Sequence, residues 1–90
     1  MAPEQDAVEG RLVGTITHFF GRISVGIIDL SDTLRVGETI RIKGPTTDLT
    51  QTVESMQIDH ADVETAGPGD DVAVLVTENV RVGDKVYRVA

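Results

Sequence analysis

The feature that most constrains the fold is a succession of short β-type runs separated by turn signals, which begins at Gly10. No long segment of the 90-residue chain carries helical periodicity. The aromatic residues number three, so the core must consist of Val, Ile and Leu, which favour strands over helices. Closely spaced short strands are typical of a sandwich or a barrel. The sequence therefore predicts an all-β protein.

Two runs near the start of the chain predict how their strands lie. In the first, Leu12, Ile16 and Phe20 share one parity and are expected to face the core. The run from Ile23 to Ile28 is apolar on both faces, which predicts a strand at the centre of the sheet.

Two patterns occur later in the chain. The apolar parity changes between Val53 and Met56, which predicts a bulge near Glu54-Ser55. Residues 34–42 and 80–88 share the order apolar, Arg, Val, Gly, acidic, with a β-branched residue after one further position. We interpret this echo as two similar tight turns that each lead into a strand. A duplicated half-barrel is the alternative interpretation.

The organisation predicted from composition is one domain, residues 10–90, after a flexible acidic tail, residues 1–9. The tail has neither the basic nor the apolar region of a secretion signal, and no apolar run approaches membrane-spanning length. We expect no membrane association and a cytoplasmic location. There is no cysteine, which excludes disulfides and thiolate chemistry.

The net charge of −7 disfavours RNA, tRNA or DNA as a partner, because a phosphate backbone repels an acidic surface. Phe19 and Phe20 beside Arg22 suggest a stacking platform for a base, but adjacent residues of a strand face opposite ways. One phenyl ring is expected in the core and the other on the surface.

Catalytic and metal-binding motifs are weak. No glycine precedes Lys-Ser or Lys-Thr, so a phosphate-binding P-loop is absent from the sequence. His60 lies near three acidic residues, but zinc sites usually draw on Cys or several His. Asp70 and Asp71 are consecutive and would point to opposite faces of a strand. We expect no catalytic residue, no metal site and no cofactor.

Three motifs in order resemble domain II of the elongation factor Tu-like translational GTPases. They are Val36-Gly37-Glu38, the segment from Val53 to His60, and the loop and strand from Ala66 to Val72. The resemblance covers nearly the whole chain. It implies a small closed or partly open antiparallel barrel of six to seven strands, without the GTPase domain.

In that family the barrel is a docking surface, and the resemblance implies a binding surface at Thr15, Thr17, His60 and Asp71. The sequence departs from the family at Asp71, where the family has Asn, and in the hairpin around Asp29, which lacks the family's glycines.

The expected function is a non-catalytic binding or adaptor module with an unidentified protein partner. Similar barrels also occur as accessory domains of collagenase-like peptidases and of RNA-modifying enzymes, so an accessory subunit or domain of such an enzyme is the alternative. A direct RNA or tRNA binder is a further alternative. An open sheet edge could pair two copies unless Arg41, Lys43 and Lys85 blunt it, and the oligomeric state stays open.

Overall fold

The computed structural model describes residues 10–89, and every regular element in this range is a β-strand. The strands are β1 (Gly10–Phe20), β2 (Val25–Leu30), β3 (Leu34–Arg35), β4 (Thr39–Lys43), β5 (Asp48–Thr52), β6 (Met56–Ile58), β7 (Ala61–Val63), β8 (Thr65–Ala66), β9 (Asp71–Leu75) and β10 (Lys85–Val89). The predicted all-β class is confirmed. The predicted flexible tail, residues 1–9, lies outside the described residues. No helix that could span a membrane is found between residues 10 and 89.

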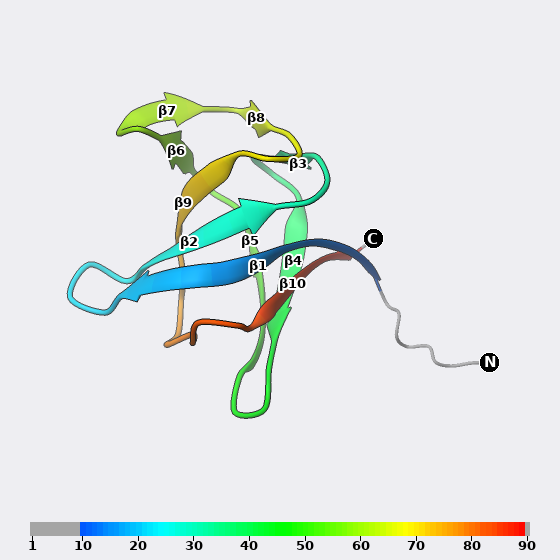
Figure 1. Cartoon of the computed structure of the whole chain (residues 1–90), viewed down its shortest axis with the longest axis vertical. Helices are drawn as coiled ribbons and strands as arrows, with labels where there is room; N and C mark the ends of the chain where they lie inside the picture. The colour runs from blue at the N-terminus through cyan, green and yellow to red at the C-terminus, as the bar shows by residue number, and fades with distance from the viewer. Residues whose placement is uncertain (1–9, 90) are drawn as a thin grey trace.

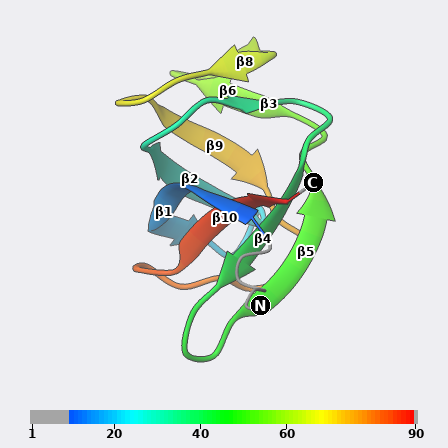
Figure 2. The ribbon, with the colours of Figure 1, turned by 90° about the vertical axis from the view of Figure 1, so that its right-hand side faces the viewer.

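Eight strands form one antiparallel sheet in the order β5-β4-β10-β1-β2-β9-β6-β7 (Figure 1). β3 and β8 form a separate pair, which lies toward the top of Figure 2. The closed form of the predicted barrel is wrong, because the edge strands β5 and β7 of the sheet do not pair with each other. The predicted count of six to seven strands is also too low, since short strands such as β3, β7 and β8 carry too few residues to show a pattern.

The side chain of Gln51 links β5 to the C-terminal end of β9. The Gln51 amide nitrogen donates to the Leu75 carbonyl at 2.8 Å, and its amide oxygen accepts from the Thr77 backbone N–H at 2.9 Å. The Thr77 hydroxyl also lies 3.3 Å from that oxygen. These bonds satisfy backbone groups that a strand ladder would otherwise pair.

The inner face of the curved sheet holds one hydrophobic core, as expected for alternating strands. One of its rows runs through Leu49, Ile42 and Val86 on β5, β4 and β10, whose backbones pair in register. A second joins Ile16, Ile28 and Val72 on β1, β2 and β9. All six side chains are buried, so Val, Ile and Leu build the core as the composition predicts.

β1 departs from simple alternation. Two register shifts, one in each half of the strand, mark β-bulges. Each bulge adds a residue and turns the following side chains to the other face. Val13, Ile16 and Phe19 therefore face the core at a spacing of three. The parity prediction is wrong for Leu12 and Phe20, which are 44% and 49% exposed.

The predicted bulge at Glu54-Ser55 is also wrong. β5 ends at Thr52 and β6 begins at Met56, so the change of parity marks a break between two strands. β5 pairs with β4, whereas β6 pairs with β7 and β9. Val53 directly follows β5, and Met56 begins β6. Both are buried because the chain changes direction between them, and not because one strand is distorted.

Three turns share one construction: Arg35–Glu38, Gly67–Asp70 and Arg81–Asp84. The third residue of each is a glycine with φ of 98°, 90° and 96° in that order. The acidic side chain at the fourth position accepts a hydrogen bond from the N–H of the first residue, at 2.9, 2.9 and 2.8 Å. The N–H of the acidic residue donates back to the carbonyl of the first.

Each turn is anchored to one buried residue elsewhere in the chain. The glycine N–H donates to the carbonyl of that residue, whose N–H donates to the carbonyl of the acidic residue, all at 2.8–2.9 Å. The anchors are Val53, Leu30 and Ile16, in the order of the turns. The echo between residues 34–42 and 80–88 is therefore two copies of one turn, as we interpreted it. The third copy escaped notice because Pro68 stands where the others have Val.

The position predicted for the run from Ile23 to Ile28 is confirmed: β2 lies between β1 and β9 inside the sheet. The expected blunting of a sheet edge by basic residues is wrong. Arg41 and Lys43 belong to β4, and Lys85 belongs to β10, and neither strand is at the edge.

Candidate binding surface

Side chains on the outside of β1, β2 and β9 form a continuous surface, which we call the β1–β2–β9 face. Cross-strand partners in an antiparallel sheet point to the same side, so the register defines its rows. Its members are Thr15, His18, Phe20, Val25, Ile27, Asp29, Asp71, Ala73 and Leu75.

Two of the four predicted binding residues meet on this face. Thr15 pairs with Asp29 across β1 and β2, and Asp29 pairs with Asp71 across β2 and β9. On the other side of Thr15, the row continues to Lys85 on β10. The structure thus brings Thr15 and Asp71 into one polar row, with Asp29 between them.

Thr17 lies one step along β1, within the second bulge. Its side chain is half-buried, and its hydroxyl donates to the Ile27 carbonyl at 3.4 Å. The same oxygen lies 3.3 Å from Nδ1 of His18. Thr17 therefore supports the bulge, and its hydroxyl already has partners within the protein.

His60 occupies the turn between β6 and β7. Both Asp59 and His60 have positive φ, 52° and 66°, and both side chains are exposed. Because Gln57 pairs with Ala73, continuing the register brings this turn level with the start of β9. The turn lies beyond β6, outside the three strands that carry the other predicted residues.

The end of the face at the β1–β2 turn is apolar. Phe20, Val25 and Leu75 form one cross-strand row, and Phe20 and Leu75 are 49% and 53% exposed. In the neighbouring row, the His18 ring stacks on Phe20 with ring planes 3° apart and centroids at 6.2 Å. Ile23, in the turn itself, is 63% exposed. The outer face of a one-sided antiparallel sheet is usually polar, so this patch is unusual.

Sequence reasoning missed this apolar patch. The run from Ile23 to Ile28 signalled it, because a strand apolar on both faces needs cover on both faces. In the described part of the chain the inner face is covered by the core and the outer face is not. Leu75 was visible as the apolar residue off the core parity of its strand.

The polar row carries two carboxylates without counterions. Asp29 and Asp71 are opposite each other and exposed, and neither side chain makes a hydrogen bond or ion pair with any of residues 10–89. Like charges at directly opposite positions destabilise a sheet.

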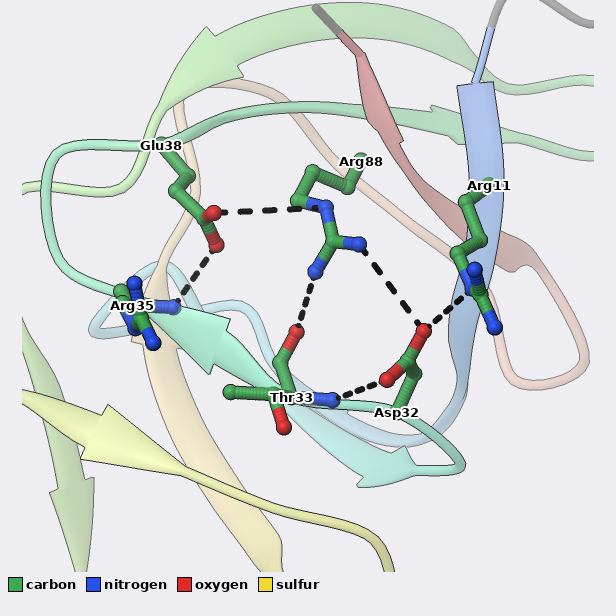
Figure 3. Close-up of polar contacts among 6 residues, drawn as sticks. All are labelled: Arg11, Asp32, Thr33, Arg35, Glu38 and Arg88. Carbon is green, nitrogen blue, oxygen red and sulfur yellow. Dashed lines mark hydrogen bonds and ion pairs between the residues drawn. The ribbon is translucent and has the colours of Figure 1, made fainter.

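The most connected polar group lies elsewhere, around Arg88 at the end of β10 (Figure 3). Its guanidinium donates to the Thr33 carbonyl at 2.7 Å and lies 3.9 Å from Asp32 and 4.0 Å from Glu38. Arg11 contacts the same Asp32 oxygen as Arg88. The group joins β1 and β10 to the loop and turn on either side of β3.

The pKa of Asp32 lies below its ordinary value in this setting. The largest cause is the hydrogen bond from the Thr33 backbone N–H, and the positive charges of Arg11 and Arg88 act in the same direction. Because each member contacts other members of the group, we assign it a structural role.

The geometry offers little for catalysis or metal binding. Within residues 10–89, no group of three or more His, Asp or Glu side chains is arranged to hold a metal ion. His18 and His60 lie on β1 and in the β6–β7 turn, and the side-chain contacts found for them involve no nucleophile with an orienting acid.

Comparisons with known proteins change the interpretation of the fold. No family model matches the chain. It is 43% identical over 76 residues to an uncharacterized protease of Methanocaldococcus jannaschii, covering 83% of this chain and 19% of that protein. It is 37% identical over 78 residues to a collagenase of Porphyromonas gingivalis, covering 84% of this chain and 22% of the collagenase. The chain thus spans about a fifth of the length of these curated relatives.

Solved structures show the same fold. The C-terminal domain of a Geobacillus thermoleovorans protein assigned to the U32 peptidases superposes with a TM-score of 0.84 at 14% identity. The match covers 89% of this chain and 93% of that domain. The selenomethionine form of the same domain gives a TM-score of 0.82.

These findings overturn the resemblance to domain II of translational GTPases and the adaptor function drawn from it. The relatives are a protease and a collagenase, and the matched fold is that of a U32 peptidase C-terminal domain. The translation-factor motifs were short turn and strand patterns, such as Val36-Gly37-Glu38, which this fold uses for its own turns. The alternative expectation, an accessory part of a collagenase-like peptidase, agrees better with the relatives.

Proposed function

We propose that this chain is a non-catalytic accessory module of a collagenase-like peptidase of the U32 kind, either within the same polypeptide or as a separate subunit. The observation that carries the proposal is sequence identity of 43% and 37% over more than four-fifths of the chain to a small part of a protease and of a collagenase. The shared fold with a U32 peptidase C-terminal domain supports it.

The chemistry of the described residues supports a non-catalytic role. Peptide hydrolysis requires an activated nucleophile or water, and a group that stabilises the oxyanion. The carboxylates of Asp29 and Asp71 are exposed to solvent, where water weakens the electrostatic effects on which catalysis depends. His18 is stacked on Phe20. The reactive groups would therefore come from the peptidase body, meaning the rest of such an enzyme.

The contribution of the module would be contact and positioning. The inner face of the sheet is filled by the core, and the Arg88 group is occupied with contacts inside the fold. The β1–β2–β9 face combines exposed apolar side chains with unpaired charge. Apolar side chains are common at the centre of protein interfaces, and polar and charged ones at the rim.

The test is a reconstitution. A collagenase-like peptidase is produced with its matching segment deleted, and gelatin hydrolysis is measured with and without this chain, using an unrelated acidic domain as the control. We expect no hydrolysis by the chain alone and an increase in kcat/KM of the deleted enzyme when the chain is added. Hydrolysis by the pure chain would overturn the non-catalytic assignment. Absence of both binding and stimulation would overturn the accessory role.

A further inference from the structure

We infer that the β1–β2–β9 face docks a segment of the peptidase body that presents a lysine or arginine a short distance from exposed aliphatic or aromatic side chains. The inference rests on the proposed function and adds to it the docking surface and the chemistry of its partner. Four features of the described residues carry it: the apolar row, the opposed carboxylates, their spacing, and the distribution of charge.

The apolar row supplies the attraction. Phe20 and Leu75 are about half exposed, and Val25 between them is half-buried. Ile23 extends the patch into the turn at the end of β1 and β2. Removal of these side chains from water by a partner is favourable in proportion to the apolar area covered.

The opposed carboxylates define the charge of the partner. Asp29 and Asp71 face solvent as a directly opposite pair with no cation bonded to them in the described chain. The pair costs the free module stability through repulsion. A lysine or arginine placed between them would replace that repulsion with two charge-assisted hydrogen bonds. A nucleic acid would bring more negative charge to the same place.

The spacing limits the sequence of the docking segment. Asp29, Ile27 and Val25 lie on alternate positions of β2, and a strand rises about 3.3–3.4 Å per residue. The acidic row and the apolar row are therefore about 13 Å apart. An extended segment with a basic residue four positions from an apolar one matches both rows.

Charge elsewhere on the molecule makes this face selective. Residues 44–80 contain eight acidic residues and neither lysine nor arginine. Beyond β9, the sheet continues into the acidic β6 and β7 region, with Asp62 in the row that includes Ala73. A basic segment approaching the β9 side of the face therefore meets negative charge over a wide area, which raises the rate of encounter at low salt.

Binding of this chain to the deleted peptidase is measured by calorimetry, with four variants. Asp71→Asn and Leu75→Ser change the face, and Glu54→Gln and Val36→Ser are exposed controls outside it. We expect Asp71→Asn to weaken binding about three- to tenfold and to reduce its dependence on salt. Leu75→Ser should weaken binding tenfold or more, and the controls less than twofold.

A stability measurement on the free module separates docking from folding. Because Asp71→Asn removes repulsion, it should raise Tm by about 1–5 °C while it weakens binding. A purely structural role for Asp71 would lower both. Thermal melts of all variants also identify any that fail to fold, and Asp29→Asn then serves as a second test of the carboxylate pair.

The outcomes are distinguishable. If the wild-type chain does not bind the deleted peptidase, the proposed function fails and this inference fails with it. If the wild type binds and the two face variants bind equally well, the accessory role stands and the docking surface is wrong. Concentration-dependent dimers that Leu75→Ser abolishes would assign the face to a second copy, and RNA binding abolished by the same variant would assign it to RNA. Either result overturns the inference.

Discussion

At the scale of single residues, the fold depends on three glycines that no other residue type replaces cheaply. Gly37, Gly69 and Gly83 adopt positive φ, and a Cβ at any of them would meet no atom within 4 Å. The requirement for glycine therefore comes from the backbone conformation and not from crowding. Val36-Gly37-Glu38 and its echo made two of these turns visible in the sequence. Pro68 hid the third, because a pattern defined by Val excludes it although Pro suits the same turn position.

Gly69 and Gly67 provide a matched test of this explanation. Gly69→Ala places a Cβ at φ of 90°, where an L-residue is strained by about 1–2 kcal/mol, so Tm should fall by roughly 5–10 °C. Gly67→Ala has the same free space but no positive φ, and it should leave Tm unchanged or raise it slightly, because alanine restricts the unfolded chain. Thermal denaturation by circular dichroism measures both. Equal losses of stability in the two variants would contradict the conformational explanation.

At the scale of strands, the sequence predicted the position of β2 but not the path of the chain after β5. A run apolar on both faces requires a central strand, and β2 is central. The change of parity between Val53 and Met56 had two physical solutions, a bulge or a break, and local pattern does not distinguish them. The choice depends on which strands pair, since β5 pairs with β4 and β6 pairs with β9. The bulges of β1 were hidden for a similar reason: Leu12 and Phe20 are apolar, although they face outward.

The Arg88 group fastens the β3–β8 pair to the main sheet, and its strength should depend on pH. The folded pKa of Asp32 lies below its ordinary value of 3.8, first because the Thr33 N–H donates to the carboxylate and then because Arg11 and Arg88 are near. A carboxyl with a lowered folded pKa stabilises the fold above its unfolded pKa, and this contribution is lost as the pH falls through the folded value. The contribution should be complete above about pH 5, begin to fall near pH 3.8 and disappear as the pH falls through the lower folded pKa.

We therefore expect Asp32→Asn to have a lower Tm than the wild type at pH 6, and the difference to shrink as the pH falls below 3.8. Melting curves between pH 6 and pH 2.5 measure it. Arg11→Ala, which removes one of the two positive charges near Asp32, should show the same trend with a smaller amplitude. A difference between wild type and Asp32→Asn that stays constant over this range would show that Asp32 does not act through its charge.

At the scale of the whole molecule, charge is unevenly distributed. All eight lysines and arginines lie outside residues 44–80, whereas that segment holds eight of the fifteen acidic residues. The composition gave the net charge of −7 and disfavoured nucleic acid. Only the topology shows that β6, β7 and β9 of this segment are neighbours in the sheet, so that their charges repel one another.

Added salt should therefore stabilise the protein. Raising sodium chloride from 10 to 300 mM should increase Tm by about 2–5 °C, because screening weakens repulsion between exposed charges. Glu54→Lys, which introduces a positive charge into the acidic segment, should reduce this increase. A fall of Tm with salt would mean that attractive pairs such as Arg41–Asp48 outweigh the repulsion.

The overall topology was the least predictable level. Short strands and turns at close spacing suit a barrel and an open curved sheet equally, and the resemblance favoured the barrel. A barrel and an open sheet differ in whether two strands distant in sequence pair through their backbones. Here β5 contacts the end of β9 through the side chain of Gln51, which bonds to Leu75 and Thr77, and local sequence patterns do not reveal such a contact. Of the four residues predicted for a binding surface, Thr15 and Asp71 lie in one cross-strand row, and their role in binding stays a prediction. The apolar half around Leu75 was not foreseen, because outward-facing apolar residues look the same as core residues in a sequence.

The contact made by Gln51 also predicts where the sheet should open transiently. Neighbouring strands such as β10 and β4, or β2 and β9, are held together by several backbone pairs, which must break together. At Gln51, the edge strand β5 is joined to the end of β9 by hydrogen bonds from a carboxamide, and one rotation of this side chain can break them. Transient opening should therefore begin between β5 and the end of β9. It would admit solvent to the valine and isoleucine core while the other strands stay paired.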